Sequence, residues 1–374
     1  MKKITSFIVT VCCSFTIFAQ APANYYNSAT ATGYTLKSQL KTIISANHNA
    51  LSYTPGLWNL YSSNASNNGF RDKYYENDNT ILDIYSEKPV AVDPYTYTVI
   101  SDQCGNYSSE GDCYNREHLI PQSYFDENKP MVTDAFHVWP SDGKVNGERG
   151  NLPFGKVVSA NYTSQNGTKR GTSAVTGFSG TVVEPIDEFK GDIARAYFYF
   201  ATRYEDLMDD FYVPKSPPKS QVQARVMFDG STDKVFNTGF LNVLYQWHLQ
   251  DPVSARETDL NNYIYNEQGN RNPYIDNPQY VTAVWFPNLL NTNKAELVEF
   301  NVYPNPAPKN TIYISTKEKI DLITVYNLEG KLIKKVSNPQ FNDEVFTINH
   351  LKSGTYILKL KSGKKTSTKK FIVK

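Results

Sequence analysis

Two short stretches of this 374-residue chain combine side chains that could carry out hydrolytic chemistry. The first, NREHLIPQSYF at 115–125, sets a glutamate beside a histidine. His118 is the side chain best suited to take a proton from water near neutral pH. Glu117 offers a hard carboxylate ligand for Mg²⁺, Mn²⁺ or Ca²⁺. A Glu-His pair by itself is more often an ordinary pair of polar surface residues, so this stretch alone does not establish a site.

The second stretch, DAFHVWPSDGKVNGERGNLPFG at 134–155, offers a complementary set of groups. Ser141 or Asp142 can cap a short helix through GKVNGERGN. Asn146 and Arg149 then fall on one face of that helix, at positions i and i+3. An amide oxygen is a hard metal ligand and a guanidinium pairs with phosphate in two-pronged fashion, so this face suits a metal-bound phosphate.

The placement of Glu117 next to His118 raises a geometric problem. Neighbouring residues of a strand point to opposite faces. If both side chains serve one site, the strand is expected to be irregular there, either at 119–121 or through the tether of a disulfide at Cys113.

The cysteine count depends on the first 19 residues. Their charged start, apolar run from Ile4 to Phe18 and small residue at Ala19 predict a secretory signal peptide, with a membrane anchor as the alternative. No later stretch is apolar enough to span a bilayer, so we expect a soluble, exported protein.

Only Cys104 and Cys113 remain once the signal peptide is removed, and in an oxidising compartment we expect them to pair. Two cysteines cannot build a four-sulfur zinc site.

Charge is divided unevenly along the chain. Residues 299–374 carry 14 Lys or Arg and 6 Asp or Glu, a net of +8, which leaves −7 on the rest of a chain whose net charge is +1. A polyanion bound by the larger part must therefore meet a local basic patch. Bulk charge argues neither for nor against a nucleic-acid substrate.

Hydrophobic spacing predicts the elements that must position these residues. Helices are expected at 36–48, 184–210, 239–252 and 254–270, and short strands or extended chain at 71–100. The aromatic residues of ARAYFYFATRY have the spacing of a buried helix face, so we interpret them as core rather than as base-stacking platforms. After about residue 290 short alternating strands predict a small antiparallel β-sandwich.

The tail resembles a known sorting domain. NVYPNP, ITVYNLEGKLI, LKSGTYILKL and the terminal KKFIVK are similar to the C-terminal sorting domain of the type IX secretion system. The resemblance implies the secretion machinery as a partner and an extracellular or cell-surface location. A sandwich that binds carbohydrate or stiffens the chain is the alternative. The expected division is a signal peptide at 1–19, a catalytic domain at 20–290, a linker at 291–300 and the sorting domain at 301–374.

The catalytic part resembles the bacterial endonuclease I family. The resemblance rests on GDCYNREH with PQS, on D-x-x-H-x-x-P-S-D-G-K-V-N-G-x-R-G-N, on KGDIARAYFYFATRY, and on the run from WHLQDPV to GNRNPYID. It implies an α+β fold in which a ββα-metal (His-Me finger) nuclease core is embedded in a mostly helical domain. It also implies that His118 is the general base and that Glu117 and Asn146 hold one divalent metal, Mg²⁺ first, with Mn²⁺ or Ca²⁺ as alternatives.

The family's phosphate-binding arginine has no counterpart at its usual place. Between the histidine strand and the asparagine helix this chain has only Lys129 and Lys144. Its replacement is left open among four arginines from other segments: Arg116, Arg149, Arg203 and Arg271. We expect His137 and Asn151 to support the site from behind the directly acting groups, and His248 to be structural.

The resulting functional hypothesis is a secreted, metal-dependent, non-specific endonuclease that cuts DNA, RNA or both to 5′-phosphate products. The alternative from another class is a catalytically inactive secreted protein for nucleic-acid binding or adhesion. A third hypothesis is a metal-dependent hydrolase of another phosphodiester or of protein. The sequence shows no zinc-protease helix with paired histidines, which argues against it. The preference between DNA and RNA, the release or attachment of the protein, and its oligomeric state are left open.

Overall fold

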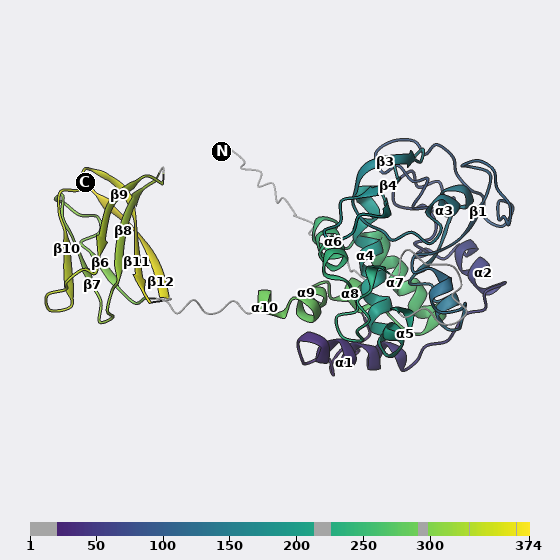
Figure 1. Cartoon of the computed structure of the whole chain (residues 1–374), viewed down its shortest axis with the longest axis horizontal. Coiled ribbons are helices and arrows are strands. Elements are labelled where there is room, and N and C mark those ends of the chain that lie inside the picture. Colours follow the sequence, from purple (N-terminus) through teal and green to yellow (C-terminus); the bar gives the residue numbers. More distant parts are fainter. Residues whose placement is uncertain (1–20, 213–225, 291–297, 329, 364) are drawn as a thin grey trace, which may run out of the picture. The chain divides into compact units, whose positions relative to one another are not determined.

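A computed structural model (Figure 1) describes residues 21–212, 226–290, 298–328, 330–363 and 365–374. The expected signal peptide and most of the expected linker lie outside these ranges. The chain forms two compact units, one ending at Pro287 and the other beginning at Asn288. Within the described ranges, no helix has both the length and the apolar character that a membrane span requires.

The first unit mixes helices with two small sheets. Its helices are α1 (Gly33–Ser45), α2 (Gly56–Ser62), α3 (Gly143–Arg149), α4 (Lys190–Arg203), α5 (Met208–Tyr212), α6 (Thr238–Gln250), α7 (Ala255–Gln268), α8 (Pro273–Asp276) and α9 (Gln279–Trp285). The short helix α10 (Pro287–Leu290) begins at the last residue of this unit. Its strands are β1 (Tyr114–His118), β2 (Val138–Asp142), β3 (Val157–Thr163), β4 (Lys169–Ser173) and β5 (Thr181–Glu184). The expected α+β class is confirmed.

Helix α4 forms the centre of this unit. Every residue from Gly191 to Thr202 is buried, so the aromatic run is core, as the sequence predicted. The predicted helix at 184–210 was too long, however. Its first residue, Glu184, is the last residue of strand β5, which pairs with β4, and Pro185 follows. Its last residues leave the helix after Arg203 and turn through a short 3₁₀ segment, Glu205–Leu207.

An ionic network inside the core joins α4 to α7. Arg195 is completely buried and donates to both carboxylate oxygens of Glu257, and Arg256 pairs with Asp192 at 2.7 Å. Glu257 also completes a capping box with Ser254 at the start of α7. Buried charges are tolerated when they are paired and hydrogen-bonded, so these contacts specify how the two helices meet.

Of the short strands or extended chain expected at 71–100, no strand forms. The segment is irregular, and only a single bridge joins Arg71 to Ile81. Carboxylates bind its backbone instead: Asp72 accepts three backbone N–H groups and Asp83 accepts those of Tyr85 and Asp142. Such side-chain bonds offer the backbone an alternative to a β-ladder. Helices α1, α6 and α7, by contrast, confirm the predicted ones to within a few residues.

The β3–β4–β5 sheet was not predicted, because β3 is mostly exposed and carries no alternating apolar pattern. The hairpin of β1 and β2 is antiparallel, and its register is continuous from Tyr114–Asp142 to His118–Val138. Helix α3 follows β2 at once. Asp142 accepts the N–H of Val145 at 2.7 Å, which confirms the predicted helix cap.

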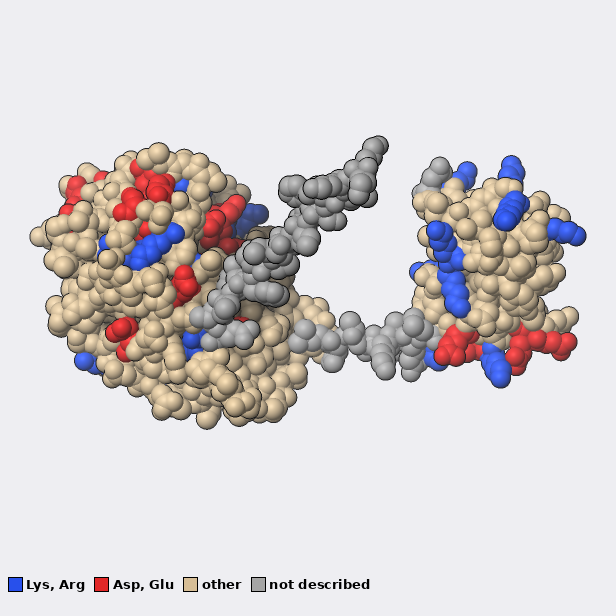
Figure 2. Space-filling model, turned by 180° about the vertical axis from the view of Figure 1, so that it is seen from behind, with Lys and Arg blue, Asp and Glu red and all other residues tan. Residues whose placement is uncertain are grey.

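The second unit consists of two antiparallel sheets around one core. Its strands are β6 (Asn301–Tyr303), β7 (Ile312–Ser315), β8 (Leu322–Asn327), β9 (Leu332–Ser337), β10 (Val345–Ile348), β11 (Gly354–Ser362) and β12 (Lys365–Val373). They pair in the orders β10–β7–β6 and β12–β11–β8–β9. Residues of both sheets share a single apolar cluster. Figure 2 shows Lys and Arg side chains spread over the visible face of this unit, in keeping with its positive charge.

Candidate active site

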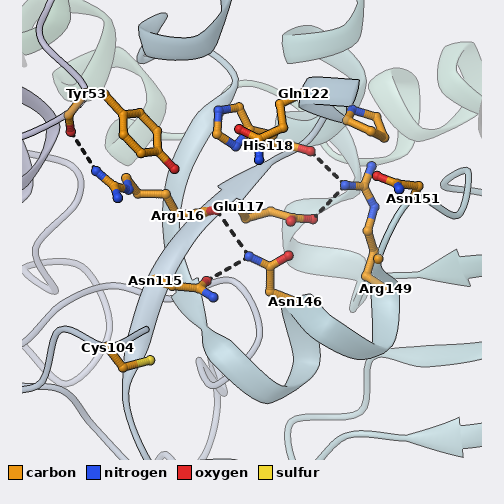
Figure 3. A pocket seen from close by; sticks show the side chains of 12 residues that line it. Tyr53, Cys104, Asn115, Arg116, Glu117, His118, Gln122, Asn146, Arg149 and Asn151 are labelled. Atoms are coloured by element: carbon orange, nitrogen blue, oxygen red, sulfur yellow. Dashed lines mark hydrogen bonds and ion pairs between the residues drawn. The ribbon is translucent and has the colours of Figure 1, made fainter. Parts of the chain in front are cut away.

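A cavity of about 320 Å³ opens where β1 and α3 lie against each other. Figure 3 shows its lining, which comprises Tyr53, Cys104, Asn115, Arg116, Glu117, His118, Pro121, Gln122, Asn146, Arg149, Gly150 and Asn151. Both sequence stretches singled out for their chemistry therefore contribute to one cavity. They meet because α3 starts directly after the strand that pairs with β1.

Glu117 and His118 both line this cavity although they are neighbours on a strand. Up to this pair the strand is regular: Glu117 pairs with Trp139 and His118 with Val138 in unbroken register. The irregularity lies at 119–121, the first of the two places where the sequence led us to expect it. The strand ends at His118, after which the chain turns through Leu119 and Ile120 to Pro121. The end of the strand, and not a distortion within it, leaves both side chains at the same cavity.

The Glu117 carboxylate is buried and held at one oxygen. Its Oε1 accepts the hydroxyl of Tyr85 at 2.8 Å and lies 3.3 Å from the Arg149 guanidinium. Burial raises the pKa of Glu117, against the lowering effect of Arg149 and Tyr85. Among the described residues nothing binds its second oxygen, Oε2, which is therefore available to a ligand in the cavity.

Asn146 turns its amide oxygen toward Glu117 (Figure 3). Its Nδ2 donates to Asn115 Oδ1 at 2.7 Å and to the carbonyl oxygen of Arg116 at 3.2 Å. These two acceptors fix which end of the amide carries nitrogen. A carboxylate oxygen and an amide oxygen thus face the same space, which is the kind of donor set that a hard divalent cation prefers.

His118 is held in one tautomer by a backbone contact. Its Nε2 lies 3.1 Å from the carbonyl oxygen of Val132, and because a carbonyl can only accept, Nε2 carries the hydrogen. The other nitrogen, Nδ1, then has a free lone pair. Burial, with a smaller contribution from His137, lowers the pKa of His118 to about 3. The ring is neutral at physiological pH and able to accept a proton.

His137 lies behind His118 and does not reach the cavity. The two rings are 6.1 Å apart, and His137 is fully buried with Nε2 bonded to the Met131 carbonyl oxygen at 2.7 Å. Phe200 of α4 packs against it. Burial lowers the pKa of His137 to about 4, so it supports His118 as a neutral ring.

The candidate arginines occupy very different places. Arg149 borders the cavity but is 2% exposed, and it donates to the carbonyl oxygens of His118 and Leu119. Arg271 does not line the cavity; it forms a two-pronged pair with Asp276. Arg203 donates to Ser45, also outside the lining.

Arg116 is the arginine that faces the cavity with a partly exposed guanidinium. It stacks 3.5 Å from the ring centre of Tyr53 and 4.3 Å from that of Trp58. Its Nη1 donates to the Tyr53 carbonyl oxygen and to Thr54. The described residues offer no acceptor for Nη2 or Nε, so these groups remain free to donate to a phosphate.

The predicted disulfide is present, with an S–S distance of 2.07 Å between Cys104 and Cys113. The loop that it closes packs on α3. Added Cβ atoms at Gly143 and Gly147 would lie 2.6 and 2.2 Å from the side chain of Tyr107, so only glycine allows this ring to pack so closely against α3. The Cys113 carbonyl oxygen also accepts the N–H of Gly143. The loop therefore supports the helix that carries Asn146.

Several residues of the site were not predicted. Tyr53 and Tyr85 come from segments 30 or more residues away in sequence. Only the fold shows that Tyr53 contacts Arg116 and that Tyr85 contacts Glu117. Asn115 and Gln122 lie two residues before and four residues after the Glu-His pair, and their polar type close to it was a usable signal. Asn151, expected at some remove from the reaction, lines the cavity itself.

Comparison with known proteins decides the family. A family model described as Endonuclease I matches residues 32–279. The chain belongs to the endonuclease I family. A second model, the secretion system C-terminal sorting domain, matches residues 301–374. Both resemblances drawn from the sequence motifs are therefore confirmed.

Named relatives support the same assignment. The chain is 32% identical over 271 residues to an extracellular ribonuclease of Bacillus subtilis (strain 168), which covers 72% of this chain and 80% of that protein. It is 33% identical over 265 residues to an extracellular ribonuclease of Bacillus amyloliquefaciens, which covers 70% of this chain and 78% of that protein. An Endonuclease-1 of Buchnera aphidicola subsp. Baizongia pistaciae (strain Bp) is 29% identical over 145 residues, which cover 39% of this chain and 46% of that protein. This endonuclease I protein is a hydrolase of the nuclease class with a secreted or cell-surface location.

Proposed function

We propose that this protein is a metal-dependent, non-specific endonuclease that hydrolyses phosphodiester bonds of DNA, RNA or both to 5′-phosphate products. The observation that carries the proposal is the meeting of Glu117 Oε2, Asn146 Oδ1 and the neutral His118 ring at one cavity. The names of the relatives point to RNA and to endonucleolytic cleavage.

The donor set fits a divalent cation. Glu117 and Asn146 supply oxygen ligands only, which suits Mg²⁺ with its remaining positions filled by water, or Mn²⁺ or Ca²⁺ in its place. The other contacts of both side chains leave those oxygens unused. Bound there, the metal would supply stabilisation of the negative charge that develops on the phosphate and the leaving 3′-oxygen.

The side chains of the protein divide the remaining work. His118 accepts the proton of the attacking water at Nδ1, since its Nε2–H is committed to Val132. The negative charge of a bound phosphate raises the proton affinity of the ring as the substrate arrives. Arg116 donates to the phosphate from a guanidinium already aligned by Tyr53 and Trp58, in the role left open by the missing loop arginine. Arg149 holds the turn after His118 and neutralises one side of Glu117.

The test is cleavage of plasmid DNA and of RNA by the purified protein with Mg²⁺ and with EDTA. We expect cleavage only with Mg²⁺, and a fall of about 10²- to 10⁴-fold in kcat for His118→Ala. His350→Asn, at an exposed position with a left-handed backbone that asparagine tolerates, is the matched control and retains full activity. Undiminished cleavage in EDTA or by His118→Ala would refute the mechanism. Salt-sensitive binding of DNA without turnover would instead favour the inactive binding protein.

A further inference from the structure

A second group of acidic side chains lies in the irregular segment that precedes β1. One carboxylate oxygen from each of Asp72, Glu76 and Glu87 lies within 4.8 Å of the other two. Asp72 and Glu87 are buried, at 2% and 1% exposed, while Glu76 lies at the surface. None of the three lines the cavity around His118. Acidic groups often gather without a ligand, so the state of each carboxylate matters.

Glu87 is the informative member of the group. Its Oε1 is closed off from solvent and has no hydrogen-bond partner among the described residues. Arg256 acts on Glu87 electrostatically, but its guanidinium is bonded to Asp192. The negatively charged side chains of Asp93, Glu76 and Asp72 also act on Glu87. A buried carboxylate of this kind lacks a counter-charge.

Asp72 is fixed in place by the chain around it. Its Oδ1 accepts the N–H groups of Tyr74 and Tyr75 at 3.0 Å, and its Oδ2 accepts that of Asn77 at 2.9 Å. Because an ionised carboxylate has about four lone-pair sites, these three bonds leave room for a cation.

We propose that Asp72, Glu76 and Glu87 bind a calcium ion. The available ligands are all oxygens, which excludes the nitrogen and sulfur preference of Zn²⁺. Calcium accepts several carboxylates in flexible geometry, whereas Mg²⁺ demands a near-ideal octahedron and gives up its waters reluctantly. Extracellular calcium sites work at dissociation constants of about 10⁻⁴ to 10⁻³ M, which matches the location of this secreted protein.

The ion would tie together the two ends of a segment that reaches the active site. Between Asp72 and Glu87, Tyr85 donates its hydroxyl to Glu117, and Asp83 accepts the N–H of Asp142, the cap of α3. Calcium bound at the ends of this segment would therefore steady the residues that orient Glu117. Its role is structural, and it is separate from the metal proposed at Glu117 and Asn146.

The experiment measures calcium binding without relying on catalysis. In the full-length protein carrying Asn146→Ala, which removes one ligand from the catalytic cavity, we expect equilibrium dialysis to find one Ca²⁺ per chain. We also expect 5 mM Ca²⁺ to raise the unfolding temperature by about 5 °C. Adding Glu87→Gln should abolish both effects. Adding Glu76→Gln should weaken binding about tenfold, and the exposed Glu127→Gln, outside the group, should leave it unchanged.

Three results would overturn the proposal: no bound Ca²⁺ in the Asn146→Ala protein, an equal thermal shift after Glu87→Gln, or an equal shift with Mg²⁺. Circular dichroism without calcium establishes that Glu87→Gln is folded, as expected when an amide of nearly the same shape replaces a carboxyl group. If that variant fails to fold, the surface variant Glu76→Gln decides the question, since unchanged binding there excludes the site. A loss of nuclease activity alone bears only on the proposed catalytic mechanism.

Discussion

Glu117 is oriented by a hydroxyl from outside both catalytic stretches. Tyr85 donates to its Oε1 and so leaves Oε2 for the proposed metal. Side chains that hold a metal ligand in this way typically affect metal affinity about 10- to 100-fold. We therefore expect Tyr85→Phe to raise the Mg²⁺ concentration needed for half-maximal cleavage by at least about tenfold, measured from initial rates across a Mg²⁺ titration.

The control for this effect is Tyr263→Phe, which removes another buried hydroxyl, bonded to the carbonyl oxygen of Leu60. Tyr263→Phe should lower the free energy of unfolding by about as much as Tyr85→Phe does, without changing the Mg²⁺ concentration needed for half-maximal cleavage. An equal shift in both variants would show that Tyr85 acts through general stability alone.

Arg116 presents a guanidinium that is already stacked and hydrogen-bonded. A lysine keeps the charge but loses the stacking and the two-pronged geometry. We expect Arg116→Lys to raise KM for RNA or DNA about tenfold with a smaller change in kcat. Arg203→Lys, which changes contacts with Ser45 and Tyr204 away from the cavity, should match the wild type in steady-state kinetics. A fall in kcat with KM unchanged would place Arg116 outside substrate binding.

The residues of the site were easier to find from sequence than their supports. Glu117, His118 and Asn146 stand in local motifs, and their residue types together with the family resemblance singled them out. Asn146 needed only a capped helix, and Asp142 confirms that cap. Tyr53 and Tyr85 depend on contacts between distant segments, and the irregular course of 71–100 depends on carboxylates that bind backbone. The spacing of hydrophobic residues along the sequence gives no information about such contacts.

At the scale of elements, the disulfide loop supports α3 and the start of β1. Its cysteines are nine residues apart, and a cross-link over a loop of this size contributes about 2–3 kcal/mol to stability. Replacing both cysteines by serine should lower the free energy of unfolding by that amount in urea titrations. The wild type in reducing buffer should reproduce the loss. Equal stability of oxidised and reduced protein would contradict this expectation.

Helix α1 is anchored by a buried lysine whose titration can be followed. Lys37 is fully buried and donates to the carbonyl oxygens of Thr232 and Asp233, with Glu205 at 3.6 Å. Burial lowers its pKa from 10.5 to about 8. Between pH 8 and 10.5 the unfolded chain holds a proton that the folded one has released, so this group makes stability rise with pH.

Lys37→Met removes that dependence. Relative to the variant, the wild type should gain up to about 1.4 kcal/mol of unfolding free energy per pH unit from pH 8 to 10, in parallel urea titrations. Taking the difference between the two proteins cancels the titration of all other groups. A difference that is constant across this range would show that Lys37 keeps its ordinary pKa.

At the scale of the whole molecule, each of the two units has its own apolar core. Every residue proposed for catalysis belongs to the first. A chain ending at Leu290 should therefore cleave nucleic acid within about twofold of the full chain and fail only in export. Calorimetry of the full chain should show two transitions, with the first unit melting within about 2 °C of its truncated form. A larger shift would mean that the units stabilise each other.

The separate cores also determine which part of the protein resists a pulling force. A force applied to the tail is resisted by the strands of the last unit, whereas the packing around α4 belongs to another cooperative structure. Secretion machinery that binds the sorting domain can thus move, cleave or unfold that domain while the catalytic unit stays folded. The catalytic unit can therefore be exported in its folded state and need not refold after export.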